Sequence, residues 1–186
     1  MHELFERRAS TRSLDPTAEV TRAQLRDILD AARWAPTWGG MQPIRFVAGR
    51  RGDGVFERLA ETLRRGNTWA KDAGALVLVC TEVREEGRPD RYADVDAGLA
   101  TAQLILQAVA HGLVAHPMAG FYPDRARDAF AIPEGYRPMA MIAIGAAAAP
   151  DTVAPEVAER DAAPRTRLPL DEIVFGERFG EPADLG

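Results

Sequence analysis

The chain changes from helix to strand within one stretch, Arg33-Trp34-Ala35-Pro36-Thr37-Trp38-Gly39-Gly40-Met41-Gln42-Pro43-Ile44-Arg45-Phe46. Pro36 ends the preceding helical pattern, because proline lacks a backbone N–H and disfavours helix at the residue before it. Gly39 and Gly40 can adopt positive φ or let a ligand approach the main chain closely. The two tryptophans favour a flat apolar surface beside a flexible loop. From this stretch alone, a plain helix-to-strand connection, with its tryptophans covering a core edge, is the favoured interpretation.

The bulk composition is that of an ordinary globular chain, with 46% hydrophobic and 27% charged residues among 186. This length suffices for one domain, residues 1–186, with a sizeable core. The net charge of −5 argues against nucleic acid as a partner, since phosphate backbones require a basic surface. Cys80 is the only cysteine, which excludes an internal disulfide framework and a thiolate metal site.

The sequence also suggests a location. The first residues contain no apolar signal-peptide core. The most apolar run, residues 97–118, is interrupted by Gln103, Gln107, His111 and His116, which suits a buried helix and strand better than a membrane span. We therefore expect a cytoplasmic protein.

Local patterns predict helices and strands along most of the chain. Thr21 and Gln24 form a capping-box pattern ahead of an apolar helical face made of Leu25, Ile28, Leu29 and Ala32. Helices are also expected at 3–8, 56–63, 92–111 and 124–130, and the 92–111 segment is apolar nearly all round, which is typical of a buried helix. Strands are expected at 44–48, 75–80, within 113–121 and at 139–145, with the continuous apolar run 75–80 as a central strand.

The last part of the chain, residues 146–186, differs in character. Residues 146–164 are rich in Ala and Pro without periodicity, which predicts an extended linker or arm. Four large apolar residues follow, Ile173, Val174, Phe175 and Phe179, and a disordered tail has little use for them. We expect them to dock, either on their own domain or on a partner subunit.

Two clusters of arginines and hydroxyls stand near the two ends of the chain. One is Arg7-Arg8-Ala9-Ser10-Thr11-Arg12, and the other is Arg165-Thr166-Arg167. If the C-terminal arm folds back, the two clusters would bracket one anion, because guanidinium forks match phosphate oxygens. The alternative is that both are solvated surface charges, with Ser10 and Thr11 acting as caps.

Motifs for other chemistries are missing. The sequence has no G-x-G-x-x-G after a strand, no G-x-x-x-x-G-K-[ST] and no serine in a nucleophile elbow. His2, His111 and His116 do not form a metal-ligand pattern, Asp94 and Asp96 suit the start of a helix, and Cys80 on a central strand is expected to be an inert core thiol. A catalytic function would therefore need a bound cofactor that carries the reactive chemistry. Flavin mononucleotide (FMN) fits, since it requires cations for its phosphate, N–H donors for its ring edge and an open ring face.

The sequence resembles the nitroreductase-like FMN-dependent oxidoreductase family. Arg7-Arg8-Ala9-Ser10-Thr11-Arg12 is similar to the family's R-R-x-S-x-R, and residues 35–46 are similar to its A-P-S-x-x-N-x-Q-P-W-x-F. Gly66-Asn67-Thr68-Trp69 resembles its N-x-W segment, and 96–113 its long central helix. Pro117-Met118-Ala119-Gly120-Phe121 and residues 165–170 match its later signatures, so six motifs stand in the family's order.

The resemblance implies an α+β fold with a mainly antiparallel sheet between helices, and a homodimer with its FMN sites at the subunit interface. The 92–111 helix would lie at the dimer core, and the C-terminal arms, residues 146–186, would embrace the other subunit. Carried over by position, one subunit would contact FMN through Arg8, Ala9, Ser10, Arg12, Asn67, Lys71, Ala119, Gly120, Arg165 and Arg167, and the partner through Pro36, Thr37, Trp38, Gly40 and Gln42. The Ala119 and Gly120 amides would face N5 and O4, while Arg12 and Asn67 would meet the pyrimidine edge.

The implied activity is reduction of an electron-poor acceptor, such as a nitroaromatic or a quinone, by NAD(P)H in a ping-pong cycle, with no side chain acting as nucleophile. Two departures alter the substrate pocket: Gly40 replaces the family's Asn, and Ile44 replaces its Trp. Trp38 could narrow this pocket or stack on a guest ring. Two alternatives stay open, a flavin-binding or storage protein without efficient turnover, and a structural protein whose arginines bind no cofactor.

Overall fold

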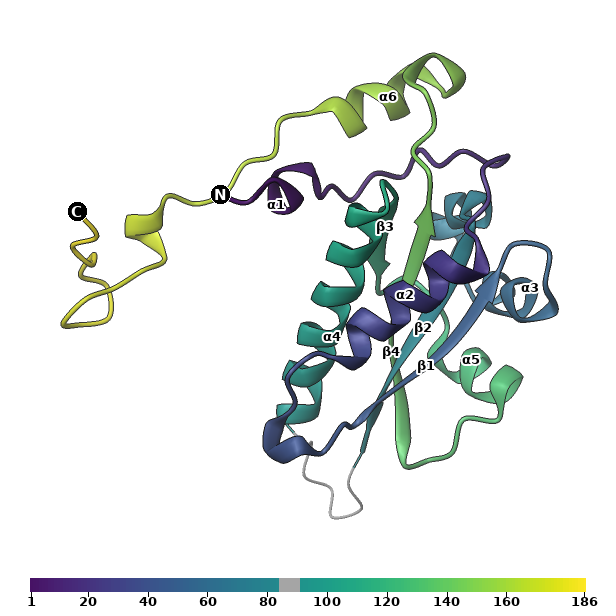
Figure 1. Ribbon diagram of the computed structural model, residues 1–186, viewed down its shortest axis with the longest axis horizontal. Coiled ribbons are helices and arrows are strands. Elements are labelled where there is room, and N and C mark those ends of the chain that lie inside the picture. Colours follow the sequence, from purple (N-terminus) through teal and green to yellow (C-terminus); the bar gives the residue numbers. More distant parts are fainter. Residues whose placement is uncertain (84–90) are drawn as a thin grey trace.

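Four antiparallel strands form the sheet at the centre of the computed structural model, which describes residues 1–83 and 91–186 (Figure 1). The strands are β1 (Ile44–Arg50), β2 (Ala75–Glu82), β3 (Val114–Met118) and β4 (Tyr136–Gly145), in the order β1-β2-β4-β3. The apolar run predicted as a central strand is β2, which pairs with β1 on one side and β4 on the other. The prediction for β4 was three residues too short at its beginning, since the strand starts at Tyr136.

Helices cover both faces of the sheet, because alternate residues of β2 point to opposite sides. Val77 and Val79 belong to the core beneath α2 (Arg22–Arg33) and α4 (Arg91–Ala110). Leu76 and Leu78 belong to the second core, which contains residues of α3 (Gly54–Glu61), α5 (Pro123–Phe130) and the 3₁₀ segment η2 (Arg65–Asp72). The predicted α+β fold, with a mainly antiparallel sheet between helices, is confirmed.

Local sequence signals determine where α2 begins and where α4 ends. The capping box at the start of α2 is present, since Thr21 Oγ1 accepts from the Gln24 amide and Gln24 Oε1 accepts from the Thr21 amide. Gly112, which follows α4, has φ +75°, and the Leu113 amide donates back to the Ala108 carbonyl. A glycine in this conformation is the common end of an α-helix, as the sequence predicted.

In the single chain, α4 is buried on one side only. Tyr92, Val95 and Leu99 follow one another along its outer face and are 40%, 57% and 41% exposed. The expectation of a helix apolar nearly all round is correct, but these side chains face away from the chain's own core. Within the described residues, no helix is long and apolar enough to cross a membrane.

The C-terminal segment contains a helix where the sequence predicted an extended linker. α6 (Pro155–Ala162) starts with Pro155, because proline at the first helical position loses no intrahelical hydrogen bond. The prediction failed because the short helix has no apolar repeat and no buried residue. Beyond α6 the arm passes α1 (Glu3–Arg7), forms the short turn η4 (Leu170–Glu172) and ends away from the sheet (Figure 1).

The tip of the arm leaves apolar side chains in solvent. Phe175 and Phe179 pack on each other with ring centroids 4.6 Å apart, in a small turn closed by the amide of Ala183 donating to Val174. Phe179 is nevertheless 94% exposed. These residues dock on no other part of the described chain.

Candidate functional site

The two arginine clusters line one cavity of about 330 Å³. The segment that follows α1 contributes residues 8–12, and the arm contributes Arg165 and Arg167. The cavity is completed by His116 of β3 and by Arg160, Asp161 and Ala163 in and after α6. The arm does fold back, so the two ends of the chain meet as the sequence suggested they could.

Arg165 pins the arm to the N-terminal helix. Its guanidinium donates to the carbonyl oxygens of Phe5, Glu6 and Arg8, at the C-terminal end of α1. Helix C-termini leave such carbonyls without intrahelical partners, and a cation near them is favourable. Arg7 in turn donates to the Val109 carbonyl near the end of α4, 3.2 Å away. The walls of the cavity are therefore held by arginines that bind backbone oxygens.

The cavity has an excess of positive charge. Burial, together with the positive charges of Arg165 and Arg167, holds the pKa of Arg8 below its usual value, and the Arg8 guanidinium donates to Ser10 Oγ at 3.0 Å. Among the described residues that line the cavity, the one carboxylate, Asp161, is already engaged. Its Oδ2 accepts from the amides of Arg12 and Ser13 and from Ser13 Oγ, and its Oδ1 accepts from Arg160.

The pKa of Asp161 reflects these bonds. Burial favours the neutral carboxyl, but the hydrogen bonds from Ser13 and Arg160 outweigh it and lower the pKa to about 2. Asp161 is therefore ionised at neutral pH and satisfied by its neighbours, and it does not neutralise Arg8 or Arg167. Such a set of donors suits an anion with several oxygens, such as a phosphate.

Aromatic rings connect the cavity to a second group of predicted residues. The His116 ring lies 4.7 Å from the Trp69 ring, and the Arg12 guanidinium lies 5.9 Å from the same Trp69 ring. Two residues before Trp69, Asn67 Nδ2 donates to the Gly120 carbonyl at 3.0 Å. The indole N–H of Trp69 is buried and has no hydrogen-bond partner among the described residues.

The absence of a side chain at Gly120 allows this close approach. A Cβ on Gly120 would lie 2.4 Å from Asn67 Nδ2, a distance that side chains do not tolerate. The Gly120 carbonyl also accepts from the Arg64 amide, whereas the amides of Ala119 and Gly120 donate no turn or loop hydrogen bond within the described residues. Lys71 is exposed in the last turn of η2.

The remaining predicted residues lie at the other end of α4. Pro36, Thr37, Trp38, Gly40 and Gln42 surround the short turn η1 (Trp38–Gly40). Its backbone is left-handed at Gly39, Gly40 and Gln42, with φ of +56°, +69° and +49°. The Trp38 ring stacks on Tyr92, with centroids 4.2 Å apart and planes 6° from parallel.

Asp96 fixes this turn, and its role was missed in the sequence. It was assigned to the start of the helix, yet it is only 3% exposed, and its two oxygens accept from the Trp38 amide at 3.1 and 3.2 Å. A signal was available, because Asp96 shares a helix face with Ala93, Ala97 and Ala100, and a carboxylate on a buried face needs a partner. Its partner, 58 residues earlier, could not be named from the pattern.

One chain does not bring all the predicted residues together. Arg7 contacts Val109 near the end of α4, whereas Trp38 contacts Tyr92 and Asp96 near its start. α4 contains 20 residues and measures about 30 Å at 1.5 Å per residue. The arginine cavity and the η1 turn therefore cannot contact one small ligand within a single chain.

Comparison with known proteins decides the family. Residues 5–68 and 57–146 match the sequence model of the Nitroreductase family. The chain belongs to the nitroreductase family. Its sheet, with helices on both faces, agrees with the fold of solved nitroreductase structures.

Three known proteins illustrate how similar other members are to this chain. A crystal structure described as an oxidoreductase containing FMN is 34% identical, with a TM-score of 0.87 over 96% of this chain and 92% of that chain. An uncharacterized 15.4 kDa protein of Mycolicibacterium smegmatis, encoded in the ask 5′ region, is 47% identical over 147 residues, 75% of this chain and 99% of its own. A Streptomyces coelicolor protein, named provisionally as an NADH dehydrogenase or NAD(P)H nitroreductase, is 32% identical over 154 residues, 70% of this chain and 75% of its own.

Proposed function

We propose that this nitroreductase-family chain is an FMN-dependent oxidoreductase, with the FMN phosphate bound in the arginine cavity. The observation that carries the proposal is the excess of guanidinium groups there, since Asp161 is satisfied elsewhere and leaves Arg8 and Arg167 to an outside anion. Ser10 Oγ adds a neutral donor beside Arg8. The relative with 34% identity is described as containing FMN, which supports the same cofactor here.

The residues beside the cavity fit a flat ring. Gly120 lies so close to Asn67 that a side chain at position 120 would clash with the Asn67 amide group. The backbone amides of Ala119 and Gly120 are available as hydrogen-bond donors. In this proposal the amides of Ala119 and Gly120 would donate to the edge of the flavin ring, Asn67 and Arg12 would contact its pyrimidine side, and Lys71 would lie nearby. When bound, FMN supplies reversible hydride transfer.

The protein's part in the reaction is to orient reactants and to exclude water. NAD(P)H and an electron-poor acceptor, such as a nitroaromatic or a quinone, would occupy the same open ring face in turn. The Trp38 ring, 61% exposed and stacked on Tyr92, supplies a flat apolar wall for this face. The NAD(P)H nitroreductase name of the Streptomyces coelicolor relative supports the choice of reductant.

The wall comes from a partner subunit in this proposal. Two α4 helices packed antiparallel with Leu99, near the middle of each helix, at their crossing would bury exposed apolar surface and bring the start of one helix beside the end of the other. The η1 turn of one chain would then face the arginine cavity of its partner. A homodimer thus explains how residues at opposite ends of α4, a helix about 30 Å long, can share a ligand.

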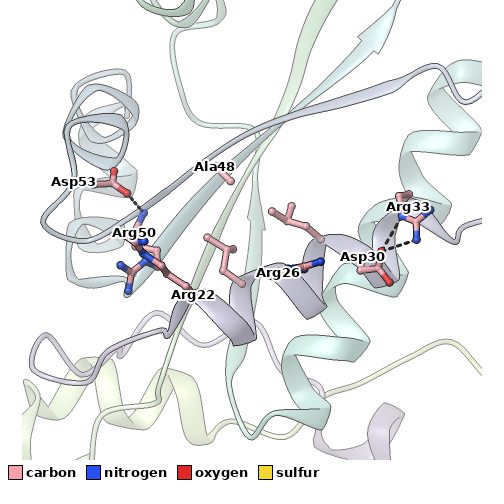
Figure 2. A pocket seen from close by; sticks show the side chains of 9 residues that line it. Arg22, Arg26, Asp30, Arg33, Ala48, Arg50 and Asp53 are labelled. Carbon is pink, nitrogen blue, oxygen red and sulfur yellow. Dashed lines mark hydrogen bonds and ion pairs between the residues drawn. The ribbon is translucent and has the colours of Figure 1, made fainter.

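The C-terminal arm has a matching surface for the same assembly. A cavity of about 490 Å³ lies between α2 and the edge strand β1, with Arg22 and Arg50 at one end and the Asp30–Arg33 ion pair at the other (Figure 2). Residues 168–186 carry five carboxylates against one arginine, together with the exposed apolar side chains of the tip. An arm that crosses to the partner would place opposite charges together and cover apolar surface on both chains.

A spectrum of the purified protein tests the function. We expect yellow protein that releases FMN on denaturation, is bleached by NADH or NADPH, and regains its colour with a quinone. Colourless protein that binds no added FMN would refute the proposal. Yellow protein that neither reductant bleaches would instead support the flavin-storage alternative.

A further inference from the structure

His116 lines the arginine cavity with its ring in a fixed orientation. Its Nδ1 lies 3.1 Å from the Thr11 carbonyl oxygen, which can only accept, so Nδ1 carries a proton. In the neutral ring the lone pair is therefore on Nε2. A tilted contact with the Trp69 ring, with centroids 4.7 Å apart and planes at 52°, restrains the His116 ring further.

The charged groups around His116 come from every element that lines the cavity. Arg8 and Arg12 come from the N-terminal segment, Arg160 and Asp161 from α6, and Arg165 and Arg167 from the arm. Burial, followed by the charges of Arg12 and Arg160, holds the pKa of His116 below its usual value, although hydrogen bonds to the backbone of Thr11 and Ser10 oppose the shift. The ring is consequently neutral near pH 7.

A dianion in the same cavity would reverse this balance. Opposite charge close to an imidazole favours its protonated form, and the arginines that disfavour a second positive charge would themselves be neutralised. Since Asp161 is engaged with Ser13 and Arg160, it does not supply this compensation.

We propose that His116 is an additional anion-binding residue of the cavity, and that binding of a phosphate dianion is coupled to uptake of one proton at Nε2. The proton comes from solvent, and the protonated ring becomes a second donor toward the phosphate while Nδ1 keeps its bond to Thr11. The proposal rests on the proposed function only in taking the phosphate of FMN as the anion. By linkage, lowering the pH should tighten phosphate binding as long as the ring is neutral without the anion and charged with it.

The test is FMN titration of the full-length protein at pH 6.5, 7, 7.5 and 8, followed by flavin fluorescence. Between the two pKa values of His116, the Kd for FMN should fall by up to tenfold per pH unit as the pH is lowered. Riboflavin, which lacks the phosphate, should bind with little dependence on pH. Sulfate is dianionic throughout this range, so its inhibition constant, corrected for the Kd of FMN measured at each pH, should be lower at pH 6.5 than at pH 8, which separates titration of His116 from titration of the FMN phosphate itself.

Two variants complete the test. His116→Asn keeps an N–H donor for the Thr11 carbonyl but cannot titrate. In this variant the inhibition constant of sulfate should therefore not change with pH, and the Kd for FMN should match that of the wild type only at pH 8. His111→Asn removes another histidine, which lies beside Asp27 and Gln107 at the end of α4, and should keep the wild-type pH profile. Calorimetry at pH 7.5 in buffers of different ionisation enthalpy should record proton uptake on FMN binding by the wild type and by His111→Asn, and none by His116→Asn beyond that of the FMN phosphate.

The outcomes separate this inference from the function on which it rests. If His116→Asn shows the wild-type pH profile and proton uptake, His116 only holds the Thr11 backbone and the inference is wrong, while FMN binding stands. If the wild type binds neither FMN nor sulfate at any of these pH values, both proposals fail. A His116→Gln variant, checked by circular dichroism, provides the same readout should His116→Asn fold poorly.

Discussion

At the scale of single residues, the arginines of the cavity have different roles. Arg165 donates to three backbone carbonyls and holds the arm against α1, so its charge is largely engaged in the fold. Arg8 has Ser10 as its hydrogen-bond partner and two arginines as its electrostatic neighbours. Loss of Arg8 should therefore affect an anionic ligand more than it affects stability.

We predict that Arg8→Gln weakens FMN binding about tenfold to a hundredfold, which corresponds to a charge-assisted hydrogen bond of roughly 1.5–3 kcal/mol. Arg125→Gln is the matched control, because it removes the same charge from α5, where Arg125 lies 4.5 Å above the Tyr122 ring. Fluorescence titration with FMN measures both Kd values. Equal affinity of Arg8→Gln and the wild type would contradict the assignment of Arg8 to the phosphate.

Gly120 provides a second test at this scale. The methyl group of Gly120→Ala would lie 2.4 Å from Asn67 Nδ2, so the Asn67 side chain must move and its bond to the Gly120 carbonyl is lost. We expect the free energy of unfolding to fall by about 1–2 kcal/mol and the Kd for FMN to rise. Gly135→Ala is the control, since its Cβ would meet nothing within 4 Å. Thermal unfolding and FMN titration of both variants measure these effects. If Gly120→Ala had the stability and the FMN affinity of the wild type, the close approach of Gly120 and Asn67 would contribute to neither.

At the scale of elements, long-range hydrogen bonds place the pieces that surround the cavity. Asp161 ties α6 to the segment after α1, 148 residues earlier, through the amide and hydroxyl of Ser13. Asp96 does the same for α4 and the η1 turn. In both cases a carboxylate accepts hydrogen bonds from backbone amides. These bonds position a loop that has no apolar face to pack against the core.

The low pKa of Asp161 makes the first of these attachments dependent on pH. A carboxyl whose pKa falls from 3.8 when unfolded to about 2 when folded stabilises the fold above pH 3.8, and this contribution is lost as the pH falls through about 2. We predict that Asp161→Asn lowers the free energy of unfolding by roughly 1–3 kcal/mol at pH 7, the usual size for a charge-assisted hydrogen bond. The deficit relative to the wild type should stay constant down to about pH 4 and shrink below it. Urea unfolding at several pH values measures it, and a deficit that grew on acidification would contradict this account.

At the scale of the whole molecule, the single chain leaves much apolar surface uncovered. Val95 and Leu99 on the outer face of α4 and Phe179 at the tip of the arm are exposed, and the groove beside β1 is open. A symmetric dimer would cover all three and would complete the proposed site, so assembly and cofactor binding should depend on each other.

We predict that Leu99→Glu yields a monomer that retains little FMN. Leu99 is 41% exposed in the single chain, so the substitution should disturb the proposed dimer contact far more than the chain's own core. Tyr122→Glu, at a residue of similar exposure (39%) beside α5, should stay dimeric and yellow. Sedimentation velocity with absorbance at the flavin band measures assembly and cofactor together. A Leu99→Glu dimer with full FMN content would exclude this face as the interface.

Much of the fold could be predicted because its signals are local. The Thr21 capping box, the apolar run of β2 and the position of Gly112 each depend on residues within a few positions of one another, and the structure confirms all three. α6 was missed because a short exposed helix has no apolar period to detect. The partners of Asp96 and Asp161 were missed because nothing near either carboxylate in the sequence identifies an amide 58 or 148 residues away.

The sequence by itself determined most of the helices and strands, the family resemblance and the chemical character of the two arginine clusters, since these depend on residue type and spacing. Only the tertiary structure decided that the two clusters share one cavity, that Asp161 leaves the cavity positive and that His116 lies within it. It also decided that the η1 turn lies at the far end of α4 from this cavity. The physical reason is that charge excess, burial and distance belong to groups brought together by packing, and packing joins residues whose separation along the chain carries no information about their separation in space.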